Sequence, residues 1–241
     1  MKIFDLDSPF MQFLNKMADL LWLNILTFVC CIPIVTIGAS LTAMHYMALK
    51  MVRNEECYIT RGFFKSFKEN FRQATLIWLI LLVVFAVLIG DFIIMRSSVI
   101  EFPEVLQIVI TAVGVLVLFV AAFVFPVLAK FDNSIFRTLK NALIMSILQF
   151  PKTIAMIVLG IVVPAALYIF VPASTPFVFL FGLSVPAFLS AMMYNKFFKK
   201  LEDQMEEANG AGEKSDPEED ERIFKDELDE TLTGRDEPKD R

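Results

Sequence analysis

Four uncharged runs divide the chain, and they predict where helices cross a membrane. Residues 20–49, 73–90, 105–129 and 153–195 contain no Asp, Glu, Lys or Arg. A helix needs about 20 apolar residues to cross the roughly 30 Å hydrocarbon core of a bilayer. Helices of soluble proteins carry a polar stripe, and residues 105–129 and 153–171 show none. The pattern therefore predicts an all-α polytopic transmembrane helical bundle.

The fourth run is too long for one helix. Pro172 and Pro176 lie near its middle, and two prolines within five residues break helical hydrogen bonding. We therefore expect a turn over 172–176 and a separate span on each side of it. About five spans result, over residues 18–44, 75–95, 105–129, 153–171 and 177–195.

The first run also contains a break, at Cys31-Ile-Pro-Ile-Val-Thr-Ile-Gly38. Pro33 removes a backbone donor and Gly38 weakens a helix. One interpretation is a kinked helix that spans the membrane. The other is a re-entrant pair of half-helices with unwound backbone buried in protein. We favour the kinked helix, and we predict that residues 33–40 form a non-helical break buried among the other spans.

Basic residues orient the spans. The segment 50–72 contains six Lys or Arg and 130–152 contains four, whereas 96–104 contains Arg96 alone and 172–176 contains none. Because basic residues near span ends stay in the cytoplasm, both long segments and the C-terminus are predicted to be cytoplasmic in a multi-pass plasma-membrane protein. Five spans place the N-terminus outside, whereas a re-entrant first segment places it inside.

Two of these cytoplasmic segments are predicted to be amphipathic helices. In the first, Phe63, Phe64, Phe67 and Phe71 recur at helical spacing, with Lys65 and Lys68 between them. Aromatic and cationic positions in this pattern are typical of a helix that lies in the membrane interface. The second stretch, 131–150, contains a related string that includes Phe136 and Lys140.

The C-terminal region has a different composition. Residues 201–241 hold 17 Asp or Glu and 6 Lys or Arg, a net charge of −11, with few large apolar side chains. Such a segment buries too little apolar surface to offset its ordering entropy. We therefore expect a transmembrane domain over 1–200 and a disordered acidic cytoplasmic tail over 201–241. Within that tail, 222–232 has apolar residues at helical spacing and could fold on a basic partner.

Candidate chemistry is sparse. His45 is the one histidine in the sequence, and the phosphate-loop, HExxH, GxSxG and GxGxxG motifs do not occur. The basic residues are as many as topology requires, so we expect no nucleic-acid partner, no metal, no cofactor and no enzymatic reaction. Polar residues within spans are costly, which singles out Asn24 and Asp91. Around the first break, Thr36, Ser40 and His45 are the candidate site residues.

Several of these segments together resemble a known family. Trp22, the run 31–43, Leu49-Lys50, Glu55 and the run 63–74 are similar to the YesL-like family of bacterial integral membrane proteins, a domain of unknown function. The similarity covers about residues 1–201. It implies a polytopic plasma-membrane protein without known catalytic residues, and such genes often lie beside carbohydrate ABC-transport and sensor genes.

Two functional hypotheses follow from the resemblance and the composition. The first is a non-enzymatic accessory to carbohydrate uptake or sensing that lies in the lipid bilayer and binds an ABC-transporter or sensor complex. Its contact surfaces would be the Phe-rich segment and the acidic tail. The second is a small-molecule transporter whose site lies at the break over 33–38.

Overall fold

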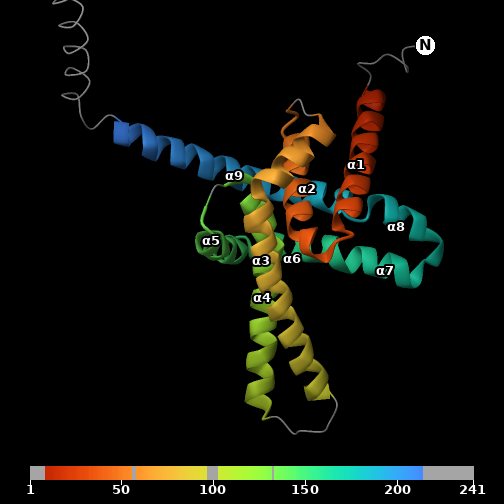
Figure 1. Cartoon of the computed structure of the whole chain (residues 1–241), viewed down its shortest axis with the longest axis vertical. Coiled ribbons are helices and arrows are strands. Elements are labelled where there is room, and N and C mark those ends of the chain that lie inside the picture. Colours follow the sequence, from red (N-terminus) through yellow and green to blue (C-terminus); the bar gives the residue numbers. More distant parts are fainter. Residues whose placement is uncertain (1–8, 56–57, 97–102, 132, 214–241) are drawn as a thin grey trace, which may run out of the picture. The chain divides into compact units, whose positions relative to one another are not determined.

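We describe a computed structural model of the chain, in which residues 9–55, 58–96, 103–131 and 133–213 are described (Figure 1). The chain divides into two units, residues 1–195 and residues 196–241. Every regular secondary-structure element in the described ranges is a helix, which confirms the all-α prediction. The docking segment expected over 222–232 lies outside the described residues.

The first uncharged run folds as a helical hairpin. Helix α1 (Pro9–Cys31) is followed by the 3₁₀ turn η2 (Ile34–Thr36) and helix α2 (Ile37–Val52). The Lys16 Nζ atom donates a hydrogen bond to Asn54 Oδ1 at 2.8 Å. One continuous helix would hold these residues about 57 Å apart, because each residue adds 1.5 Å. The kinked helix over 18–44 is therefore wrong, and the chain turns back at Pro33.

The break is shorter and more exposed than the sequence suggested. Helix α2 begins at Ile37, so 37–40 is helical, and the exposed fractions of Ile32 and Ile34 are 76% and 63%. The prediction of a non-helical break over 33–40, buried among the other spans, is wrong. A 3₁₀ turn with local hydroxyl partners satisfies the freed backbone groups, so this turn does not need burial in protein.

Two long helices form an antiparallel pair beside the hairpin. Helix α3 (Ile59–Arg96) includes both the Phe-rich segment and the predicted span 75–95, and α4 (Glu104–Lys130) includes the predicted span 105–129. Much of the segment 50–72 is therefore helix. Figure 1 shows α3 and α4 side by side. The apolar residues that face away from the bundle, such as Val83 (60% exposed) and Ile108 (68%), suit a lipid environment.

The second amphipathic stretch forms helix α5 (Ile135–Leu148), which leads into the fourth predicted span. That span consists of α6 (Phe150–Ile157), the π-helical turn η3 (Val158–Val162) and α7 (Val163–Phe170). Together they form the candidate span Phe150–Phe170, in agreement with the predicted 153–171. Gly160 and Pro164 lie in this stretch, where a weak helix former and a missing backbone N–H favour a local irregularity.

The predicted turn at 172–176 is present as the 3₁₀ turn η4 (Pro172–Ser174). After it, α8 (Thr175–Phe181) and α9 (Ser184–Glu213) are bent by 50° at a short break. The predicted span 177–195 is thus a broken helix. Residues 201–213, the first part of the predicted tail, belong to α9.

The described helices agree with a polytopic membrane protein. Four of them are long and apolar enough to cross a bilayer, and a fifth span results if the bent pair α8–α9 is counted as one. The core of residues 1–195 lies where α2 packs on α3 and α4. Its largest buried side chains include Phe63, Phe123 and Met47.

Candidate functional site

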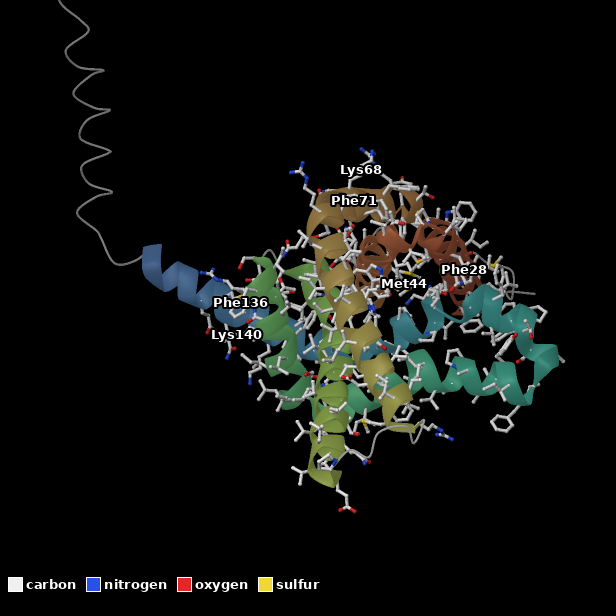
Figure 2. The ribbon with its side chains drawn as sticks, turned by 60° about the horizontal axis from the view of Figure 1, so that its bottom comes forward. Phe28, Met44, Lys68, Phe71, Phe136 and Lys140 are labelled. Atoms are coloured by element: carbon white, nitrogen blue, oxygen red, sulfur yellow. The ribbon has the colours of Figure 1, made fainter. Side chains whose placement is uncertain are left out.

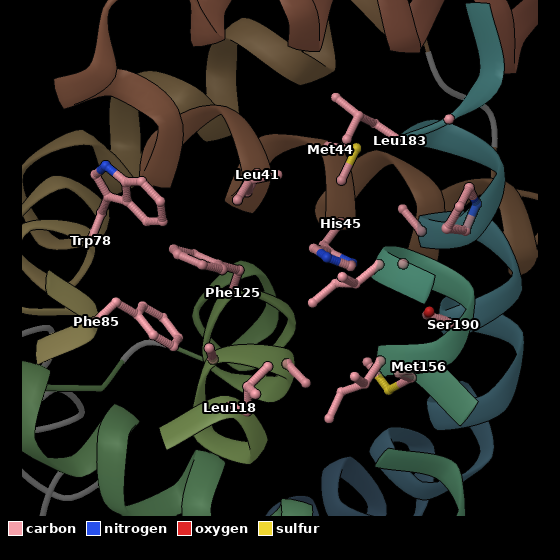
Figure 3. A pocket seen from close by; sticks show the side chains of 18 residues that line it. Leu41, Met44, His45, Trp78, Phe85, Leu118, Phe125, Met156, Leu183 and Ser190 are labelled. Carbon is pink, nitrogen blue, oxygen red and sulfur yellow. The ribbon is translucent and has the colours of Figure 1, made fainter. Parts of the chain in front are cut away.

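A partly open cavity of about 280 Å³ lies in the membrane domain, beside the hairpin. Figure 3 shows the side chains that surround it. Its walls come from α2, α3, α4, the α6–η3 segment and the junction of α8 with α9. The lining includes Leu41, Met44, His45, Trp78, Phe85, Leu118, Phe125, Met156, Gly160, Leu183 and Ser190. Segments that are far apart in the sequence therefore build one site.

The walls of this cavity are mainly apolar. His45, Trp78 and Ser190 are the lining residues whose side chains carry nitrogen or oxygen. Trp78 is already engaged, because its Nε1 atom donates to the carbonyl oxygen of Ile34 at 2.8 Å. The Trp78 ring also lies 6.4 Å from the Phe125 ring, centroid to centroid. Only the imidazole and the serine hydroxyl are left to bind polar groups in the cavity.

His45 is held by a residue from the last helix. Its Nδ1 atom lies 3.4 Å from the hydroxyl oxygen of Tyr194, a long hydrogen bond, and the Tyr194 side chain is buried. Figure 3 shows the imidazole ring at the edge of the cavity. Among the described residues, Nε2 has no hydrogen-bond partner. The ring can thus offer one nitrogen to a molecule in the cavity.

The two other residues predicted around the first break lie elsewhere. Thr36 Oγ1 donates to the carbonyl oxygen of Cys30 (2.6 Å) and lies 2.8 Å from that of Pro33. Ser40 Oγ donates to the carbonyl oxygen of Thr27 at 2.9 Å. Both hydroxyls stabilise the hairpin. Of the three predicted residues, the structure places only His45 at the cavity.

Asn24 connects the hairpin to the break in the last span. Its side chain is 1% exposed, and its Nδ2 atom donates to the carbonyl oxygen of Phe179 at 2.8 Å. The Oδ1 atom accepts hydrogen bonds from the backbone N–H groups of Leu183 (3.0 Å) and Ser184 (2.9 Å). These N–H groups lie at the start of helix α9, where the first N–H groups of a helix lack a carbonyl partner within that helix. Asn24 therefore caps a helix that is distant in sequence.

The other singled-out residues lie apart from the cavity. Asp91 is partly buried near the end of α3. In the Phe-rich segment, Phe63 is fully buried and stacks on Phe67 at 6.2 Å, whereas Phe64 and Phe71 are 39% and 37% exposed. The side chains of Lys65 and Lys68 are exposed as well. This segment is therefore partly protein core and partly surface.

Figure 2 shows the two amphipathic segments with their side chains, including Phe71 and Lys68 on α3 and Phe136 and Lys140 on α5. The exposed fraction of Phe136 is 78%. Its neighbours one and two turns later, Lys140 and Ile144, are also exposed. Helix α5 thus presents both apolar and basic side chains on its surface, as the sequence indicated.

Sequence reasoning missed several residues that matter here. Ser190 and Trp78 lie in uncharged stretches of α9 and α3, and Gly182 lies in the break that Asn24 caps. Of these residues, Gly182 carried the clearest signal in the sequence, because glycine is common where a helix breaks. In the structure it lets the backbone pass close to Val178: an added Cβ would contact the Val178 carbonyl oxygen and lie 3.2 Å from the Val178 side chain. The partnership of this break with Asn24 carries no signal in the sequence. We found no group of three or more His, Cys, Asp or Glu side chains suited to a metal ion in the part described.

These features define a polytopic helical membrane protein with a mainly apolar, partly open cavity. Residues 19–92 match a family described as "Protein of unknown function, DUF624". The matched region contains most of α1, the turn at Pro33, α2 and most of α3. Comparisons with curated proteins and with solved structures gave no match.

Proposed function

We propose that this protein is a non-enzymatic, YesL-like accessory to carbohydrate uptake or sensing that acts in the plasma membrane by binding another membrane complex. The polarity of the cavity is the observation that carries this proposal. A sugar is bound through many hydrogen bonds, because each of its hydroxyl groups loses water on binding. The cavity offers mainly His45 and Ser190, too few partners for a sugar.

The exposed part of the Phe-rich segment supports a role in binding a partner. Phe64 and Phe71 are partly exposed beside Lys65 and Lys68. Aromatic side chains with neighbouring cations supply contact energy and specificity at interfaces. The segment begins α3 and packs through Phe63 into the core, so a partner bound here would touch a rigid element. The acidic tail would add a second, electrostatic contact.

A transporter function is the second candidate, and the broken helices favour it. Many transporters bind their substrates where discontinuous helices expose backbone groups near the middle of the membrane. Here the chain breaks at Pro33 and again at Gly182. However, Asn24 already occupies the Leu183 and Ser184 N–H groups, and Thr36 bonds the Cys30 carbonyl. These backbone groups are therefore not free for a substrate.

Site-specific photocrosslinking in native membranes tests the accessory function. A photoreactive residue at Phe64 or Phe71 should form adducts with a subunit of a carbohydrate transporter or sensor. The same residue at Phe63, which is buried, is the matched control and should form none. Purified protein in liposomes should not move sugars. Sugar flux in liposomes, without adducts at either exposed position, would favour the transporter instead.

A further inference from the structure

We propose that the cavity beside His45 binds an alkyl chain that ends in one uncharged hydrogen-bonding group, a hydroxyl or a carbonyl. The cavity volume is about 280 Å³. A dry cavity of about 150 Å³ in another protein holds one benzene molecule. By that scale the cavity has room for roughly ten carbon atoms. This inference does not rest on the accessory function and assigns a ligand to the cavity itself.

The chemistry of the walls selects hydrocarbon over water. Leu41, Met44, Phe85, Leu118 and Met156 come from different helices and all line the cavity. A buried water needs two to four polar partners, and none is available in the part of the cavity away from His45 and Ser190. An empty cavity would cost the walls their dispersion contacts. An alkyl chain restores those contacts and loses little on leaving the bilayer, which is also apolar.

Two polar atoms in the lining determine which terminal group the alkyl ligand can carry. Figure 3 shows His45 and Ser190 on the walls of the same cavity. Ser190 is 4% exposed, and no hydrogen bond of its hydroxyl group is present among the described residues. The Nε2 atom of His45 is likewise available. A hydroxyl or carbonyl group can bond both, whereas a charged group would meet no ion-pair partner in the lining.

The ligand chemistry has two sources: an acyl chain of a membrane lipid, whose ester carbonyl is the hydrogen-bonding end, or a free long-chain alcohol. The cavity lies among helices that carry exposed apolar side chains. An alkyl ligand can therefore enter laterally from the bilayer, between these helices. Gly160 belongs to the lining and is itself exposed. A Cβ atom built on Gly160 has no other atom within 4 Å. A larger side chain at this position therefore meets no steric obstacle, and because Gly160 lines the cavity we expect a leucine there to fill part of it.

Photolabelling with a diazirine-bearing decanol tests the proposal on the full-length protein in detergent micelles. Labelled peptides should contain lining residues such as Phe125 and Met156. Gly160→Leu should reduce the labelling at least fivefold. Gly114→Leu is the matched control, because Gly114 also has open space around its Cβ position but does not line the cavity. Equal labelling in both variants, or labelled peptides away from the cavity, would overturn the proposal.

A second variant tests the hydrogen-bonding end without filling the cavity. Ser190→Ala should weaken decanol binding about threefold to tenfold and leave binding of the corresponding alkane probe unchanged, since one hydrogen bond is lost. An equal effect on both probes would refute the assigned orientation.

Native mass spectrometry of the purified protein then distinguishes the two sources of the ligand. A bound phospholipid identifies a membrane lipid chain, and a lighter adduct identifies a free amphiphile. Both outcomes support the site, and Gly160→Leu should remove either adduct.

Discussion

The Oδ1 atom of Asn24 accepts a hydrogen bond from the backbone N–H of Ser184 at 2.9 Å, across 160 positions of the sequence. This bond joins the first hairpin to the break between α8 and α9. Ring contact between Phe28 and Phe179, with centroids 4.6 Å apart, connects the same elements. Because the junction between α8 and α9 and the first turns of α9 border the cavity, the hairpin positions one of its walls.

Replacement of Asn24 by Leu should destabilise the membrane domain. It removes the partner of the buried Ser184 N–H and of the partly buried Leu183 N–H, and an unsatisfied buried group costs about 1–3 kcal/mol. We expect a lower midpoint of thermal unfolding in detergent. Asn15→Leu is the control, because Asn15 is an exposed residue of the same helix. Equal midpoints for the two variants would show that the α8–α9 break needs no cap.

The hairpin predicts a specific chemical cross-link. In a variant whose natural cysteines are replaced by Ala, Lys16→Cys and Asn54→Cys should be joined by a short bis-maleimide, since the native side chains are in contact. The pair Lys16→Cys and Arg96→Cys should remain unlinked. A kinked spanning helix predicts that the first pair is too distant to react. Electrophoretic mobility after proteolysis between the two positions measures the cross-link.

The Lys and Arg residues of segments 50–72 and 130–152 predict that the start of α3 and the whole of α5 lie on the cytoplasmic side. Single cysteines at Lys68 and Ser134, both exposed, should react with an impermeant maleimide only after the cells are opened. Ser66 is unsuitable for this test because it is 1% exposed. The hairpin further predicts that a cysteine at Lys16 behaves in the same way. Labelling of intact cells at 68 or 134 would reverse the proposed orientation.

Gly38 permits a close approach of α2 and α3. A Cβ atom there would contact the carbonyl oxygen of Ala74 and lie 2.6 Å from Trp78 Cβ. Gly38→Ala should therefore push the helices apart and destabilise the protein by about 1–3 kcal/mol, as overpacking does. Gly114→Ala should be neutral or stabilising, since its Cβ has open space and Ala favours a helix. Thermal unfolding of both variants in one detergent decides the comparison.

Truncation after Glu213 should separate folding from partner binding. The deleted residues 214–241 contain four large apolar side chains, Ile223, Phe224, Leu228 and Leu232, so they add little burial. We expect an unchanged unfolding midpoint and, if the tail binds a partner, loss of co-purification with it. A large fall in the midpoint would show that the deleted segment packs on the membrane domain.

The sequence by itself determined the class of this protein and most of its spans. Residues 105–129 and 153–171 are recognisable because a bilayer imposes one length and one polarity on any helix that crosses it. The turn at Pro172 is equally local, since proline prevents continued helical hydrogen bonding wherever it occurs there. The predicted orientation is also local in origin, because it depends only on which segments between the spans carry Lys and Arg.

Only the tertiary structure decided how the breaks are used. Pro33 permits either a kink or a reversal, and the choice depends on contacts such as Ser40 with Thr27 and Lys16 with Asn54. The short interruption after Gly182 is stabilised by Asn24, a residue whose sequence context suggests nothing of the kind. The cavity beside His45 needs five wall segments at once. Its existence depends on packing between distant residues, which no local pattern of polarity encodes.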